Sequence, residues 1–246
     1  MVSGTEPGDG ALMYNMSIHH NFLVHNWQRN PLIKGSGPFE IVNNLNYNWG
    51  MFGLTIDDTG SGTKVNLIGN YYKAGPDSSP IRYAVVLNEG TQPNNYIYVS
   101  DNLSAQRTSS GQPEWDIMGY CGSSGVYCGE PASSSFQKGT PWATSDHPIT
   151  INTAANTPAL VLAGAGATKP SRDANDTRLV NEYNASTGSI HNFNTWPSIA
   201  AGSPPTDADA DGMADSWETA NGVTNPNAVA PNGYTNLENY LHELTL

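Results

Sequence analysis

The sequence is poor in charge, especially in cations, and it contains only two cysteines. Charged residues make up 13% of its 246 residues, and 10 Lys and Arg stand against 22 Asp and Glu, a formal net charge of −12. This acidity argues against non-specific binding to nucleic acid, so a cluster of the few cations would mark a site for an anion. No apolar run is long enough to cross a membrane. The opening MVSGTEPGDG lacks the basic and apolar regions of a signal peptide, and we expect any export signal to lie upstream.

The residues that are abundant favour an all-β secreted protein. Hydrophobic residues account for 37% of the chain, enough for a core, and Gly, Asn, Ser and Thr dominate the rest. Cys121 and Cys128 lie on either side of a Gly/Ser loop in GYCGSSGVYCGE. Two thiolates without nearby histidines cannot complete a tetrahedral zinc shell, so the pair fits a disulfide better than a metal site. A disulfide in turn favours an oxidising compartment.

Four segments of the first half repeat one pattern: SIHHNFLV, EIVNNLNY, NLIGNYYK and YVSDNLSA. In each, an apolar or β-branched residue precedes an asparagine and a hydrophobic residue follows it. The aligned asparagines are Asn21, Asn44, Asn70 and Asn102, at intervals of 23, 26 and 32 residues. Intervals of this length are typical of successive coils of a parallel β-solenoid. We therefore predict that these asparagines stack and form hydrogen bonds along the solenoid axis.

The repeat weakens between Pro131 and Pro205. We expect strands at ITIN, residues 149–152, and at ALVLAGAGA, residues 159–167, among polar loops. The stretch SRDANDTRLVNEYNASTG predicts a short helix from Asp173 to near Gly188 that packs back along the solenoid. The composition changes after SPP, residues 203–205, which predicts a β-helix domain over 1–205 and a small module over 206–246.

The module begins with an acidic run, TDADADGMADSWE, that fits the twelve-residue calcium loop. Alternate carboxylates would point inward, Gly212 would supply the turn, and a glutamate would close the coordination sphere from the first helical turn. An acidic linker that binds no ion is the alternative. The predicted Ca²⁺ ligands are Asp207, Asp209, Asp211, the carbonyl of Met213, Asp215 and Glu218. We expect this calcium to have a structural role, because a full coordination sphere leaves no position for a substrate.

A second helix is predicted after the acidic run. Thr235 and Glu238 have the spacing of a capping box, which marks a helix start. The residues predicted to share one apolar face of that helix are Leu237, Tyr240, Leu241 and Leu244.

The stretches SIHHNFLVHNWQRNPLIKG, FEIVNNLNYNWGMFGLTI and VNLIGNYYKAGP together resemble polysaccharide lyase family one, the pectate and pectin lyases. The HHN, RNP, NN and GNYY elements occur in order, and the resemblance covers nearly the whole chain. The SRDANDTRLVNEYNASTG stretch and the acidic tail also look like the C-terminal parts of bacterial members. The resemblance implies a right-handed parallel β-helix, secretion, and cleavage of polygalacturonate or pectin by β-elimination.

The resemblance also implies roles for particular residues. Arg29, in R-x-P, matches the catalytic arginine that takes the proton from C5 of a galacturonate, and Lys34 matches a second cation that binds the substrate carboxylate. Lysine keeps the charge of the usual arginine but loses its bidentate geometry. Two further candidates for substrate binding are His20 and Trp27. The alternatives are that His19 and His20 stack between coils and that Trp27 and Trp49 pack in the core.

The sequence departs from the family at its beginning. The acidic ligands of the family's catalytic calcium, and a further catalytic lysine, belong to coils that precede the HHN element, and this chain begins only 18 residues before His19. We therefore expect a β-helix truncated at its N-terminal end, with a homodimer forming through that open end. Acids that could replace the missing ligands are the pair Asp57 and Asp58, or Glu6 and Asp9. The alternative function is a non-catalytic β-helix fragment that binds acidic polysaccharide.

Overall fold

The computed structural model describes residues 2–3, 13–57, 62–79, 81–88, 96–122, 128–144, 148–169, 171–190, 198 and 201–244. Glu6, Asp9 and Asp58 lie outside these described residues. Contacts between residues divide the chain into two compact units, residues 1–165 with 178–194, and residues 166–177 with 195–246.

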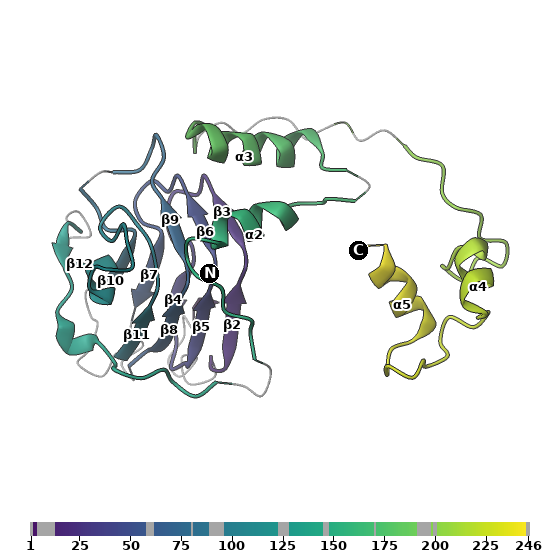
Figure 1. The fold of residues 1–246 in the computed structure, drawn as a ribbon, viewed down its shortest axis with the longest axis horizontal. Helices are drawn as coiled ribbons and strands as arrows, with labels where there is room; N and C mark the ends of the chain where they lie inside the picture. The colour runs from purple at the N-terminus through teal and green to yellow at the C-terminus, as the bar shows by residue number, and fades with distance from the viewer. Residues whose placement is uncertain are drawn as a thin grey trace. The chain divides into compact units, whose positions relative to one another are not determined.

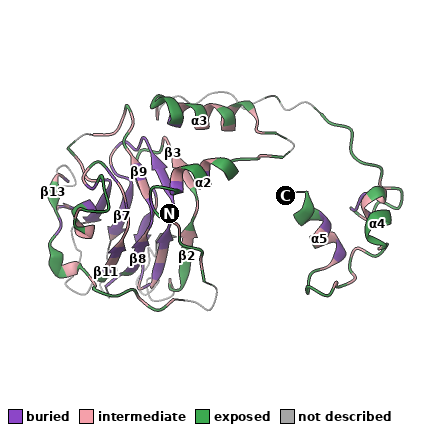
Figure 2. Cartoon of the chain, in the orientation of Figure 1, coloured by how far each residue is buried: buried purple, intermediate pink, exposed green. Residues whose placement is uncertain are grey.

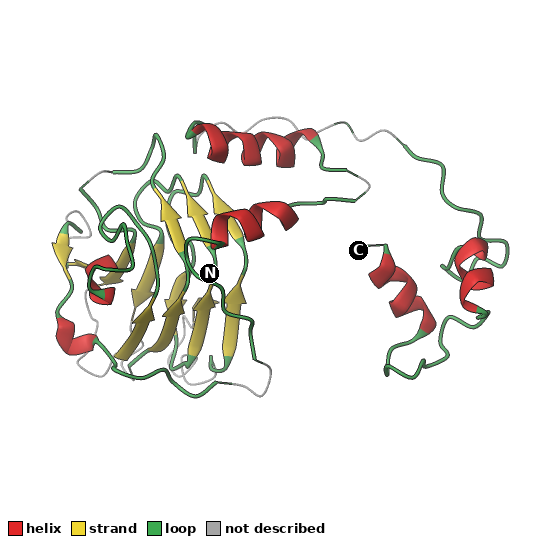
Figure 3. Cartoon of the chain, viewed as in Figure 1, coloured by secondary structure: helices red, strands yellow, loops and turns green. Residues whose placement is uncertain are grey.

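The first unit is built from three sheets of short strands (Figures 1 and 3). Sheet A has the order β1 (Val2–Ser3), β4 (Leu32–Lys34), β7 (Leu54–Asp57), β10 (Val85–Asn88), β12 (Met118–Cys121) and β13 (Glu130–Pro131). Sheet B has the order β11 (Tyr96–Ser100), β8 (Lys64–Ile68), β5 (Phe39–Val42) and β2 (Met16–His19). Sheet C has the order β3 (Phe22–Val24), β6 (Leu45–Tyr47) and β9 (Tyr71–Lys73).

The path of the chain through these sheets is that of a coil. It passes from sheet B to sheet C to sheet A and then returns to sheet B, one strand further along. Neighbouring strands of the three sheets pair in parallel, except β12 with β13, which pair antiparallel. This arrangement of mostly parallel strands with few helices is compatible with the predicted parallel β-helix.

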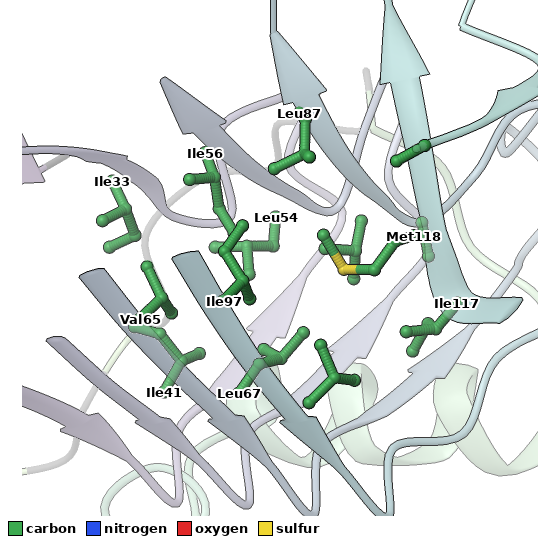
Figure 4. Packing of buried hydrophobic residues seen from close by; sticks show 14 of the residues in the cluster. Ile33, Ile41, Leu54, Ile56, Val65, Leu67, Leu87, Ile97, Ile117 and Met118 are labelled. Atoms are coloured by element: carbon green, nitrogen blue, oxygen red, sulfur yellow. The ribbon is translucent and has the colours of Figure 1, made fainter. Parts of the chain in front are cut away.

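The core consists mainly of aliphatic side chains stacked in columns between the sheets. One column in sheet A joins Ile33, Ile56 and Leu87, which are paired in register and fully buried. Columns in sheet B carry further members of the same cluster, including Ile41, Leu67, Val65 and Ile97 (Figure 4). Figure 2 shows that burial in this unit is concentrated in the strands. Because each coil stacks the same kind of side chain on its neighbour, the repeat in the sequence becomes a continuous core.

The predicted asparagine stack is confirmed. The Nδ2 of Asn21 donates to Oδ1 of Asn44 at 3.0 Å, that of Asn44 to Oδ1 of Asn70 at 3.0 Å, and that of Asn70 to Oδ1 of Asn102 at 2.8 Å. The same three acceptors also bind the backbone N–H of the preceding asparagine, at 3.1, 2.9 and 2.9 Å. The stack thereby satisfies polar groups at the corner between sheets B and C that would otherwise be buried without partners.

The expected strands at 149–152 and 159–167 are wrong. Residues 149–152 lie in a loop, and the apolar run forms helix α2 (Thr157–Gly164). Pro158 occupies the first turn of α2, where its missing N–H has no cost, and Ala and Leu favour the helix. One apolar residue of α2, Val161, packs against Leu45 and Tyr47 of sheet C. This contact with sheet C explains why the segment is apolar, the property that had led us to expect a strand.

The helix predicted from Asp173 is confirmed as α3 (Ala174–Ala185). Its C-terminal part packs on sheet C, as expected. Tyr183 lies against Tyr47, with ring centroids 5.3 Å apart, and the Lys73 ammonium donates to the Tyr183 carbonyl at 2.6 Å. Burial raises the pKa of the Tyr183 phenol to about 12, with further contributions from Tyr71 and Tyr47.

Two short 3₁₀ helices and a disulfide complete the first unit. The 3₁₀ helices are η1 (Glu114–Ile117) and η2 (Ser134–Phe136). The structure joins Cys121 to Cys128, and both residues are buried, which confirms the predicted pairing. Among the described residues, no helix combines the length and apolar character that a membrane crossing requires.

The second unit contains helices α4 (Asp215–Asn221) and α5 (Asn236–Glu243). The capping box is confirmed, because the Thr235 side chain accepts from the Glu238 N–H while the Glu238 carboxylate accepts from the Thr235 N–H at 2.7 Å. The Thr235 hydroxyl also donates to this carboxylate, at 2.8 Å, and the two hydrogen bonds that the carboxylate accepts from Thr235 lower the pKa of Glu238. Leu237 and Tyr240 pack against Met213 and Ala214, but Leu241 and Leu244 are exposed. Of the four residues predicted to form the apolar face, only Leu237 and Tyr240 therefore pack against other residues of this unit.

Candidate functional site

Arg29 is presented to solvent by the turn between β3 and β4. Its own backbone is in the left-handed region, with φ 64°, and its side chain is exposed. The next residue, Asn30, is buried. Its N–H donates to the Gly53 carbonyl at 2.7 Å, its Nδ2 donates to the Phe52 carbonyl at 3.1 Å, and its carbonyl accepts from Nδ2 of Asn46 at 2.8 Å. The inward asparagine anchors the turn to the next coil and leaves the guanidinium on the surface.

Lys34 ends β4, on the same coil as Arg29. Its ammonium lies 3.5 Å from the Asp57 carboxylate, and the two residues are register partners on β4 and β7. Both side chains are partly exposed. A carboxylate ligand approaching Lys34 would therefore compete with Asp57, and such a partly exposed ion pair holds only weakly. Asp57, which could have replaced a missing calcium ligand, is used here as the partner of a lysine.

Trp27 lies two residues before Arg29 in the same turn, and half of its surface is exposed. Its carbonyl accepts from the N–H groups of Gly50 and Met51, at 3.0 and 2.6 Å. The indole lies so close to Gly50 that any side chain there would overlap with the ring. Trp49, in contrast, is 2% exposed and belongs to the core. Of these two tryptophans, Trp27 is therefore the one whose ring can meet a sugar.

His20 lies at a different corner of the coil from Arg29. It follows β2, between sheets B and C, where its Nε2 lies 3.3 Å from Nδ2 of Asn152 and its Nδ1 lies 3.0 Å from Nδ1 of His19. Burial lowers the pKa of the His20 imidazole, and the adjacent His19 lowers it further. The structure therefore brings Trp27, Arg29 and Lys34 onto one turn and the strand after it, and leaves His20 on another corner.

The turn that carries Arg29 is also held by a network that the sequence did not predict. His25 begins this turn with its side chain buried, and its Nε2 lies 2.9 Å from the Glu182 carboxylate on α3. Arg178 binds the same carboxylate at 2.7 and 2.9 Å. The Nδ1 of His25 lies 2.8 Å from Nδ2 of Asn48, which itself donates to Asp77 at 3.0 Å. No local pattern could reveal a partner 157 residues away.

The acidic loop of the second unit gathers its carboxylates as predicted. Ligand atoms of Asp207, Asp209 and Asp211 lie within 4.8 Å of one another. Oδ2 of Asp211 is buried without a hydrogen-bond partner among the described residues. Gly212 has φ 95°, so the turn needs its glycine.

The remaining predicted ligands lie around this cluster. Burial raises the pKa of the Glu218 carboxyl, and Asp211, Asp209, Asp215 and Asp207 raise it further through their negative charges. Asp215 begins α4 and accepts from the Ala208 N–H at 2.8 Å, while Met213 is buried between the loop and α5. Crowded carboxylates and an unpartnered buried oxygen fit a hard cation bound by oxygen ligands.

A second loop repeats this backbone without its charges. Gly233 has φ 88°, and both α4 and α5 begin three residues after their glycine. The Tyr234 N–H donates to Oδ1 of Asn232 at 3.2 Å, as the Met213 N–H donates to Oδ1 of Asp211 at 2.9 Å. Nδ2 of Asn232 donates to Oδ1 of Asn239 at 2.7 Å, so two amides bind each other directly. The signal in the sequence that could have revealed this repeat is the similarity of NGYTN, residues 232–236, to DGMAD, residues 211–215.

No family model matches the chain. Curated proteins do align with nearly all of it. They are named probable pectate lyase C, from Aspergillus terreus, Aspergillus flavus and Aspergillus fumigatus, at 29%, 30% and 31% identity over 93%, 96% and 96% of this chain. The resemblance to pectate lyases therefore extends over most of the sequence. The alignments cover 53%, 55% and 55% of the relatives, so the chain spans about half the length of the curated relatives it matches.

Proposed function

We propose that this chain acts as a pectate lyase, cleaving polygalacturonate by β-elimination at the turn that carries Arg29. The observation that carries the proposal is the placement of Arg29. A buried asparagine holds the turn, the guanidinium faces solvent, and Trp27 and Lys34 lie on the same coil. The alignment with probable pectate lyases over most of the chain supports the choice of reaction.

In this reaction Arg29 takes the proton from C5 of a galacturonate, the C4–O bond breaks, and the departing oxygen takes a proton from water. The product is left with a double bond between C4 and C5. An arginine side chain is normally a protonated guanidinium, and only its scarce neutral form can accept a proton, so the C5 proton must also be made more acidic. Lys34 contributes by neutralising the substrate carboxylate next to C5. The indole of Trp27 offers an apolar surface for a sugar face, and His20 would contact only an extended substrate.

The acidic loop is proposed to hold Ca²⁺ through Asp207, Asp209, Asp211, the Met213 carbonyl, Asp215 and Glu218. Calcium would neutralise these carboxylates and join the loop to α4, which makes residues 206–246 a small helical calcium-binding module. Among the described residues, this is the one cluster of three or more potential ligands. The residues described around Arg29 do not fit a cation site, so we derive no catalytic step through calcium.

The finer features of the proposal follow the resemblance. We propose a right-handed β-helix over residues 1–205, a secreted protein, and an acidic polysaccharide as its partner. The low number of cations, 10 Lys and Arg in a chain of charge −12, agrees with a partner recognised at a local site and not through overall charge.

A second candidate function is polysaccharide binding without cleavage. The ion pair between Lys34 and Asp57 favours it, because Lys34 is then partly neutralised before substrate arrives. In this case the turn would retain its affinity for galacturonate while lacking the groups that acidify the C5 proton.

Ultraviolet absorbance of the unsaturated product distinguishes the two candidates. Polygalacturonate would be incubated with wild type, with Arg29→Ala and with a second variant that removes an arginine elsewhere, Arg172→Ala, each with and without calcium. We expect product with wild type and Arg172→Ala, and a rate at least about 100-fold lower with Arg29→Ala, because proton transfer is lost. A folded wild type that yields no product would favour binding alone, and an Arg29→Ala variant of full activity would exclude Arg29 as the base.

A further inference from the structure

Two lysines from distant parts of the chain lie over one tryptophan on sheet B. The ammonium of Lys64, the first residue of β8, is 5.2 Å from the centroid of the Trp142 ring. The ammonium of Lys138, two residues after η2, is 4.6 Å from the same centroid. The whole sequence contains 10 Lys and Arg. Bringing two of them to one ring therefore creates a cationic spot on an acidic protein.

Trp142 is fixed in place by hydrogen bonds on both sides. Its N–H donates to Oδ1 of Asn66 at 2.9 Å, and its carbonyl accepts from Nδ2 of Asn66 at 3.0 Å. Its Nε1 donates to the Tyr96 carbonyl at 2.9 Å. The segment that carries Lys138 is anchored as well, because the Lys138 N–H donates to the Ile97 carbonyl at 2.9 Å. The spot is thus built on the outer side of sheet B and is not a chance meeting of loose side chains.

In the part of the chain that the structure describes, neither Lys64 nor Lys138 forms an ion pair with a carboxylate. The Lys138 ammonium donates to the Thr140 hydroxyl at 3.0 Å, which leaves its charge intact. Each contact with the indole is weakly attractive and also leaves the charge of the ammonium intact. Two like charges near one ring repel each other, and an anion bound between them would relieve this repulsion.

An exposed aromatic ring lies next to these cations. Tyr96 begins β11, directly beside Lys64 in the register of sheet B, and is 40% exposed. An aromatic surface beside ammonium groups suits a sugar that carries a carboxylate, because the ring accepts the apolar face and the cations accept the acid. This combination fits a uronic acid better than a neutral sugar or a small anion.

We propose that Lys64, Lys138, Trp142 and Tyr96 form a second binding site for acidic saccharide, on sheet B and separate from the Arg29 turn. The choice of a uronate rests on the proposed function, whereas the cationic and aromatic character of the site does not. Lys34 ends β4 just before the bend that leads into sheet B, and the Lys64 N–H donates to the Ser36 carbonyl of that bend at 3.4 Å. The second site therefore follows Lys34 around this corner of the coil, where it would hold a further part of the polymer.

The test is binding of polygalacturonate in the Arg29→Ala background, which separates binding from cleavage. Calorimetry would compare this protein with Lys64→Gln/Lys138→Gln, with the charge-preserving Lys64→Arg/Lys138→Arg, and with Lys169→Gln/Arg172→Gln, which removes two positive charges elsewhere. We expect the first double variant to lose about 10-fold in affinity, since two charge-assisted contacts disappear. The arginine variant should retain most of the affinity, and neutral galactan should bind none of the proteins measurably.

Two results would overturn the site. One is unchanged affinity in Lys64→Gln/Lys138→Gln with its thermal unfolding unaltered. The other is an equal loss in Lys169→Gln/Arg172→Gln, which would assign the effect to net charge. The lyase proposal is tested by a different measurement, the formation of unsaturated product by the protein that retains Arg29. A failure of one proposal can therefore be told apart from a failure of the other.

Discussion

At the scale of single residues, hydrogen bonds between asparagine side chains join successive coils. In the stack, one Oδ1 accepts two hydrogen bonds from the coil before it, and the Nδ2 of Asn44, Asn70 and Asn102 also donates to a strand carbonyl at 2.7–2.8 Å. Aspartate would lack the donors, and glutamine would extend too far for the same geometry. The frequency of asparagine at one position of the repeat is therefore a direct consequence of hydrogen bonding at the corner.

Replacement of Asn44 by alanine should destabilise the first unit by roughly 2–3 kcal/mol, because it leaves the Asn21 N–H and the Ile18 carbonyl without their partners. Urea unfolding gives this free energy. Asn21→Ala is the matched control, since Asn21 is exposed at the end of the stack and its loss should cost less than about 1 kcal/mol. Equal costs at the two positions would contradict the idea that the buried stack stabilises the coils.

The cations also act as single residues. Lys34 is paired with Asp57, whereas Lys64 and Lys138 meet an aromatic ring and, among the described residues, no carboxylate. The surroundings of each lysine therefore decide how it can bind an anion. Lys34 must first release Asp57, whereas Lys64 and Lys138 can bind an anion directly.

At the scale of elements, the two loops of the second unit show how one backbone can be stabilised in two ways. Both have a glycine with positive φ followed by a helix, but the first gathers carboxylates and the second pairs two amides. Like charges repel in the first loop, so a bound cation would stabilise it, whereas the neutral loop closes by itself. Among the described residues, we therefore expect one calcium site, in the first loop.

Calcium should slow hydrogen exchange in α4 relative to the chelated protein, because the ion joins the loop to the first turn of the helix. Asp209→Asn should remove most of this response, and mass spectrometry of peptides covering residues 207–221 would report it. Asn239→Ala serves as the control, since it should weaken α5 in both conditions and leave the calcium response of α4 intact. A calcium response that survives in Asp209→Asn would contradict the assigned ligands.

Helix α3 has its effect through contacts at long range. The carboxylate of Glu182 joins Arg178 on its own helix to His25 at the start of the Arg29 turn. The sequence predicts this helix well, because the residues that favour it and the residues that end it are neighbours in the sequence. It does not reveal that the helix covers sheet C and holds this particular turn, because that depends on the coil bringing His25 and Glu182 together.

At the scale of the whole molecule, the open edges of the sheets decide how the chain can associate. Within the described residues, sheet B ends at β2 and sheet C ends at β3 (Figure 1). Met16 on β2 and Tyr14 just before it are exposed. A strand edge with exposed apolar side chains can pair with a second chain.

We predict a homodimer formed through these edges. Light scattering across the micromolar range should show the mass of two chains, falling toward one chain on dilution. Met16→Lys should shift the equilibrium toward monomer, because a lysine on an edge strand opposes pairing. Monomer at every concentration would exclude the dimer.

The sequence by itself determined the features that depend on repetition or on local spacing. The four asparagines give the coil register, Thr235 and Glu238 give the cap of α5, and the acidic run gives the cluster of Asp207, Asp209 and Asp211. In the cap and the acidic cluster, the backbone geometry of a single turn sets the distance between the residues. In the asparagine stack, that distance is set by the constant spacing from one coil to the next. The tertiary structure decided that residues 157–164 form a helix, that Lys34 pairs with Asp57, and that Lys64 and Lys138 meet at Trp142. Asn66 and Trp142 are 76 residues apart, and only the folded path of the chain places them side by side, so no local pattern contains that information.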